Sequence, residues 1–87
     1  MDATGTQTLD DVKAVLAATL GIEDRADRLT ASTVLFGGLP ELDSLAVVEL
    51  VVALEQRFGI EISDEDVTGP VFETLGSLTA LVESKLS

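Results

Sequence analysis

The sequence predicts an all-α fold: a small four-helix bundle of three main helices plus one short helix, with a long loop between the first and second. Three observations support this prediction. Apolar residues recur at three- and four-residue spacing in three separate segments, which is typical of helices with one buried face. Ser or Thr followed three positions later by Asp, as at Thr8 and Ser63, indicates helix starts. Glycines follow the first two long segments, where helices commonly end. We expect residues 1–87 to form a single domain.

The first helix is expected over about residues 9–20. Thr8 and Asp11 form a candidate capping box at its start, and Gly21 suits the left-handed position that commonly ends a helix. An apolar stripe at helical spacing lies between them, formed by Leu9, Val12, Val15, Leu16 and Leu20. Residues 1–7 are small and polar, so we expect them to be frayed.

Residues 21–43 are expected to form a long connection, because they hold a charged run and the turn formers Gly37, Gly38 and Pro40. A connection of this length is uncommon in a compact domain unless it is anchored or functional. Its apolar residues are the expected anchors, laid across the bundle: Leu29, Val34, Leu35, Phe36 and Leu39.

The second helix is expected over residues 45–58, with Gly59 at its end. Its valines favour a strand by propensity, but its length and its apolar spacing favour a helix. The predicted buried stripe consists of Val47, Leu50, Val51, Leu54 and Phe58.

Two further helices complete the predicted bundle. Ser63 and Asp66 form a capping box that opens a short helix, and Gly69-Pro70 is expected to stop it. Thr74 is the expected N-cap of the last helix. The buried stripe of that helix is predicted to consist of Leu75, Leu78, Leu81, Val82 and Leu86.

The composition is strongly acidic, with 16 acidic and 5 basic residues, no histidine and a net charge of −11. Such a chain repels nucleic acid and anionic lipid and attracts basic patches on proteins, although charge alone can also serve solubility. Half of the acidic residues lie between positions 41 and 66, where Arg57 is the only base. No apolar run approaches the length of a membrane span, and we expect a soluble, cytoplasmic monomer.

The absent residue types exclude several chemistries. Without histidine or cysteine there is no His-based triad, no thiolate nucleophile and no usual zinc site. Glycine-rich nucleotide motifs are also missing. We therefore expect no catalytic residue, no metal site and no enzyme.

Ser44 is the candidate functional residue. Capping alone could explain Asp43 and Ser44 before a helix, with either residue as the N-cap. The same position lies at the positive end of a helix dipole, which favours a phosphate, and it follows the flexible Gly37-Gly38 loop. Local physics leaves both interpretations open.

A series of motifs begins at Asp43 and continues along the chain: Asp43-Ser44-Leu45, Val48-Glu49-Leu50, Leu54-Glu55, Phe58-Gly59-Ile60 and, in the tail, Asp64-Glu65-Asp66, Phe72 and Thr74-Leu75. Together they resemble the acyl carrier proteins, a phosphopantetheine-bearing carrier family, over roughly residues 8–86. One departure is Glu41, since a glycine is common two residues before the family's aspartate.

The resemblance implies a carrier domain with a covalent 4′-phosphopantetheine on Ser44, transferred from coenzyme A by a phosphopantetheinyl transferase, with Asp43 positioning the serine. The terminal thiol of this arm would carry acyl groups as thioesters, and the acyl chain can shelter inside the bundle. The partner-facing residues would be Leu45, Val48, Glu49, Val52 and Glu55, which would meet basic patches on acyl-loading and acyl-using enzymes.

The pathway would be fatty acid biosynthesis or a dedicated lipid or secondary-metabolite pathway. An alternative within the same fold is a carrier domain for aminoacyl, peptidyl or polyketide intermediates. An alternative of another class is a small acidic helical adaptor with no prosthetic group, in which Ser44 is only a cap.

Overall fold

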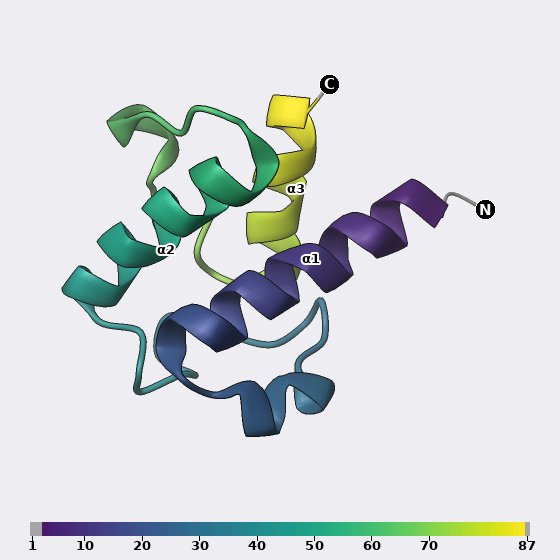
Figure 1. The fold of residues 1–87 in the computed structure, drawn as a ribbon. Helices are drawn as coiled ribbons and strands as arrows, with labels where there is room; N and C mark the ends of the chain where they lie inside the picture. The colour runs from purple at the N-terminus through teal and green to yellow at the C-terminus, as the bar shows by residue number, and fades with distance from the viewer. Residues whose placement is uncertain (1–2, 87) are drawn as a thin grey trace.

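The computed structural model describes residues 3–86 and confirms the all-α fold (Figure 1). Three α-helices form the bundle: α1 (Ala3–Leu20), α2 (Ser44–Phe58) and α3 (Leu75–Leu86). Two short 3-10 helices, η1 (Glu23–Arg28) and η2 (Asp64–Asp66), lie in the connections, and η2 is the predicted short helix.

Helix α1 begins at Ala3, so the predicted fraying of residues 1–7 and the predicted start at residue 9 are wrong for the described residues. Residues 1 and 2 lie outside the described part of the chain. Thr8 is not an N-cap, because it lies inside the helix and is only 5% exposed. It stands one turn before the fully buried Val12 on the same helix face. Burial of this face outweighs the preference of threonine for a cap.

The long connection contains a helix that the sequence did not predict. Glu23 and Asp24 lie in the first turn of η1, while Arg25 and Arg28 lie in its last turn. This arrangement suits the dipole of a helical turn. The charged run that indicated a loop therefore forms a helical turn.

The anchors of this connection are only partly those predicted. Leu29 and Leu35 are buried, but Val34 and Phe36 are 48% and 46% exposed, so the prediction is wrong for these two. The reason is the backbone path: Val34 forms a β-bridge with Thr74, Leu35 N donates to Glu73 O at 3.0 Å, and Phe36 N donates to Phe72 O at 3.3 Å where a turn over residues 36–38 begins. Successive side chains of an extended segment point to opposite sides. The core also takes two residues that the prediction missed, Ile22 and Leu42.

Gly76 lets the connection approach α3 closely. Its backbone N–H donates to the carbonyl oxygen of Ala31 at 2.7 Å. A Cβ at this position would lie 2.9 Å from the same oxygen, closer than such atoms pack. The glycine that weakens the first turn of α3 by propensity therefore allows this contact.

The ends of α2 and α3 follow the predicted signals. Gly59 adopts a left-handed conformation (φ 66°) and ends α2. Thr74 caps α3, because its Oγ1 accepts a hydrogen bond from Ser77 N at 3.1 Å. The predicted stripes of both helices are buried or half-buried, except that Leu86 is 48% exposed. Val82, one turn earlier, is the last residue of that stripe that the core covers.

Candidate functional site

Ser44 is the first residue of α2, and its side chain is exposed. Asp43 is the N-cap: its Oδ1 accepts a hydrogen bond from Ala46 N at 2.8 Å, and its carbonyl oxygen accepts one from Val47 N at 2.9 Å. Within residues 3–86, the hydroxyl of Ser44 has no hydrogen-bond partner. Because Asp43 does the capping, the hydroxyl of Ser44 is available for chemistry.

The chain is anchored immediately before this site. Leu42 is buried, and its backbone N–H donates to Leu39 O at 3.0 Å. Beside it, the guanidinium of Arg25 in η1 donates to the carboxylate of Glu41. That hydrogen bond lowers the pKa of Glu41 below its ordinary value. The unpredicted helix η1 is therefore tied to the segment that leads into Ser44.

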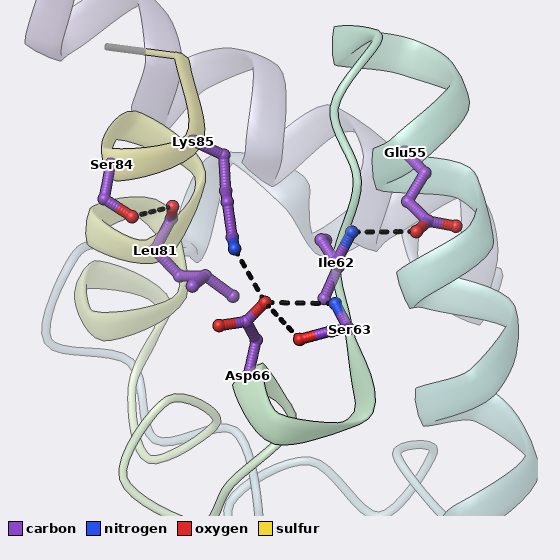
Figure 2. Close-up of polar contacts among 7 residues, drawn as sticks. All are labelled: Glu55, Ile62, Ser63, Asp66, Leu81, Ser84 and Lys85. Carbon is purple, nitrogen blue, oxygen red and sulfur yellow. Dashed lines mark hydrogen bonds and ion pairs between the residues drawn. The ribbon is translucent and has the colours of Figure 1, made fainter.

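The predicted partner face is largely exposed. Leu45, Val48 and Val52 are 67%, 59% and 44% exposed, and Glu49 is exposed as well. Glu55 differs, because its Oε2 accepts a hydrogen bond from Ile62 N at 2.8 Å (Figure 2). One oxygen of Glu55 thus holds the chain that follows α2. The partner role of all five residues stays a prediction.

A groove between α2 and η2 was not predicted. Its volume is about 180 Å³, and it is lined by Val47, Val48, Val51, Val52, Asp64 and Val67. The signal in the sequence was the surplus of valines on α2 beyond a single buried stripe. The groove begins one turn along α2 from Ser44 and is walled mainly by apolar side chains.

The carboxylate of Asp66 joins η2 to α3 (Figure 2). Its Oδ2 accepts hydrogen bonds from Ser63 N at 3.0 Å and Ser63 Oγ at 2.9 Å, and it lies 2.8 Å from Lys85 Nζ. The predicted capping box at Ser63 is thereby confirmed. The hydrogen bond from Lys85, followed by those from Ser63, lowers the pKa of Asp66 to about 2.

This lowered pKa predicts how the Lys85 contact responds to acid. Because the folded pKa of Asp66 is about 2 and its ordinary value is 3.8, the contact stabilises the fold above about pH 4. The stabilisation is lost as the pH falls through about 2. In Lys85→Met, an NMR titration should show the Asp66 pKa moved up toward 3.8. The melting temperatures of the two proteins should converge below about pH 2, and a gap that persists there would contradict the assignment.

No helix among residues 3–86 is long and apolar enough to cross a membrane. The same part of the chain holds no group of three or more His, Cys, Asp or Glu side chains placed to hold a metal ion.

Comparison with known proteins identifies the family of this chain. The family described as "Phosphopantetheine attachment site" matches residues 10–82, which include the capped start of α2 and the groove. An acyl carrier protein of Campylobacter jejuni subsp. doylei is 46% identical over 59 residues, covering 68% of this chain and 73% of that relative. The chain belongs to the acyl carrier protein family.

Further matches agree with this membership. An acyl carrier protein from another Campylobacter jejuni strain is also 46% identical over 59 residues, with the same shares of the two chains covered. The solution NMR structure of a holo acyl carrier protein from Nitrosomonas europaea superposes with a TM-score of 0.86 at 46% identity. That match covers 92% of this chain and 96% of the other. An acyl carrier protein is a carrier that other enzymes modify and load, not a catalyst, and the prosthetic group of the family is covalently bound phosphopantetheine.

Proposed function

We propose that Ser44 carries the phosphopantetheine arm and that the protein carries acyl groups on it for separate loading and acyl-using enzymes. The observation that supports this most is the exposed Ser44 hydroxyl, which has no hydrogen-bond partner within residues 3–86. When bound, the arm supplies a terminal thiol that holds the acyl group as a thioester.

The residues around Ser44 fit a phosphodiester. Its Oγ is the nucleophile: it forms a P–O bond to the pantetheine-bearing phosphorus of coenzyme A and loses its proton to a base of the transferase. The pyrophosphate P–O bond of coenzyme A breaks in the same step, and adenosine 3′,5′-bisphosphate leaves. The start of α2 carries a partial positive charge that favours the resulting anion by about 0.3–1 kcal/mol. The carboxylate of Asp43 accepts a hydrogen bond from Ala46 N. The cap therefore fixes the backbone on which Ser44 is presented to the transferase.

The groove beside α2 is the proposed shelter for the acyl chain. Its walls are mainly valine side chains, and it begins one turn from Ser44. Each methylene that leaves water there contributes up to about 0.8 kcal/mol. The net charge of −11 suits partner enzymes with basic patches. The surface that would meet them is the exposed part of α2, formed by Leu45, Val48, Glu49 and Val52.

The cargo is proposed to be an acyl intermediate of fatty acid biosynthesis or of a dedicated lipid or secondary-metabolite pathway. The relatives that match this chain are named acyl carrier proteins, which favours acyl over aminoacyl or peptidyl cargo.

Peptide mapping tests the attachment site. After incubation with coenzyme A and a broad-specificity phosphopantetheinyl transferase, the intact mass should increase by one arm. Trypsin cleaves after Arg28 and Arg57, so Ser44 lies in peptide 29–57, which contains one other serine, Ser32. Fragmentation of that peptide should place the arm on Ser44, and a sample without transferase should stay unmodified. An arm on another residue, or no arm on the folded protein, would refute the proposal.

A further inference from the structure

Glu55 gathers the chain that leaves α2 around the end of that helix. Its carbonyl oxygen accepts hydrogen bonds from Gly59 N at 2.8 Å and Ile60 N at 3.2 Å. Its side-chain Oε2 accepts a third hydrogen bond from Ile62 N at 2.8 Å (Figure 2). The first two bonds belong to the backbone, so only the third depends on the side chain of Glu55.

This third bond joins α2 directly to the chain that enters η2. Within the described residues, the other side-chain hydrogen bonds and ion pairs of residues 61–67 stay inside η2 and its cap or reach α3. Ile62 is itself buried, and a buried N–H that loses its acceptor is costly. The Glu55 carboxylate therefore opposes separation of residue 62 from α2.

The helix η2 is built as one unit with Ile62. Ser63 is the next residue, and both its N–H and its hydroxyl donate to Asp66 Oδ2, at 3.0 and 2.9 Å (Figure 2). These two bonds close η2 on itself and do not involve α2. A displacement of Ile62 from α2 would consequently carry η2 with it.

The unit that Glu55 holds supplies one wall of the groove. Asp64 and Val67 come shortly after Ile62 in the chain, and they line the groove together with the four valines of α2. Apolar attraction is short-ranged, because a gap of about 0.5–1 Å forfeits about a quarter to a half of it. The separation between this wall and α2 therefore decides how much free energy an acyl chain gains in the groove.

We propose that Glu55 is a positioning residue for the groove: its bond to Ile62 N holds the η2 wall beside α2 before an acyl chain enters. This inference rests on the proposed function, because it takes the occupant of the groove to be the acyl chain carried on Ser44. It gives Glu55 a role different from the predicted contact with partner enzymes. The exposure of the two acids on α2 agrees, since Glu55 is half-buried and Glu49 is exposed.

Amide hydrogen exchange of the unmodified protein tests the support itself. In Glu55→Ala, the Ile62 N–H should exchange about 10- to 150-fold faster, the effect of losing a hydrogen bond to a charged acceptor. Glu55→Gln keeps an oxygen that accepts the same bond and should restore most of the protection. Glu49→Ala is the matched control, because it removes an exposed carboxylate from the same helix, and it should leave the Ile62 rate unchanged. A native Ile62 rate in Glu55→Ala would overturn the inference.

The acylated protein tests the consequence for the groove. The transferase attaches butanoyl, hexanoyl and octanoyl arms from the matching acyl-coenzyme A donors, and the rise in melting temperature over the arm-only form is measured. In the native protein this rise should grow with chain length, because more methylenes leave water. In Glu55→Ala the rise should be smaller at each length, by up to about a half. Glu55→Gln and Glu49→Ala should keep the native rise.

The rise separates this role from a purely structural one. If Glu55 only stabilised the fold, Glu55→Ala would lower the melting temperatures of the arm-only and acylated forms equally and leave the rise unchanged. That outcome, or a larger rise in Glu55→Ala, would refute the positioning role. No rise in the native protein would refute it as well, because the groove would then not hold the acyl chain. Attachment at Ser44 is judged separately, since the intact mass reports the arm wherever the acyl chain lies.

Discussion

Replacing Ser44 with alanine is expected to abolish attachment of the arm and leave the fold unchanged. The hydroxyl is the atom that would form the ester, and alanine has none. The fold does not need it, because Asp43 rather than Ser44 caps α2. Alanine is also the best helix former, so the free energy of unfolding should stay within about 0.5 kcal/mol of the native value. Intact mass after treatment with transferase and coenzyme A measures the first effect, and urea unfolding measures the second.

The matched control is Ser32→Ala, since Ser32 is exposed and lies in the same tryptic peptide. It should accept one arm as the native protein does. A folded Ser44→Ala protein that still gained one arm would show that another hydroxyl is the attachment site. A Ser44→Ala protein that lost much of its stability would show instead that Ser44 is a structural residue.

The helix that carries the candidate site could be predicted because its signals are local. All three signals lie within one segment of the chain: the cap at Asp43, the apolar spacing of α2 and Gly59 at its end. Each signal depends on neighbours within a turn or two of helix, and the structure satisfies them together. The exposure of Ser44 follows from its place at the first residue of that helix.

The features that were missed depend on contacts between distant segments. Thr8 has the local pattern of a cap, but burial beside Val12 draws it into α1. The exposure of Val34 and Phe36 follows from pairing with residues 72–74, which no local pattern indicates. The groove and the Asp66–Lys85 pair likewise arise only when η2 meets α2 and α3.

Phe72 belongs to the segment that pairs with residues 34–36, and its side chain lies in the buried core. Among the substitutions considered, Phe72→Ala is expected to lower the free energy of unfolding most. Phe72 is 1% exposed and is among the largest fully buried side chains. Its backbone also bonds to Phe36, on the connection that leads to Ser44. Truncating a buried phenylalanine costs about 3–5 kcal/mol. A domain of this size has roughly 4–13 kcal/mol of stability in total. Urea unfolding should therefore show a large drop in the midpoint concentration.

Phe36→Ala is the control that separates burial from the contact between the two rings. The ring centroids of Phe36 and Phe72 lie 6.1 Å apart at a tilt of 59°, and Phe36 is 46% exposed. An aromatic pair of this kind contributes about 0.5–1.5 kcal/mol, so Phe36→Ala should cost far less than Phe72→Ala. Equal losses would mean that the side chain of Phe36 contributes to the core as much as that of Phe72. A small loss for Phe36→Ala and a large loss for Phe72→Ala would mean that the segment at residues 34–36 is held in place by the buried ring of Phe72 and its backbone hydrogen bond. The connection that leads to Ser44 would then depend on Phe72.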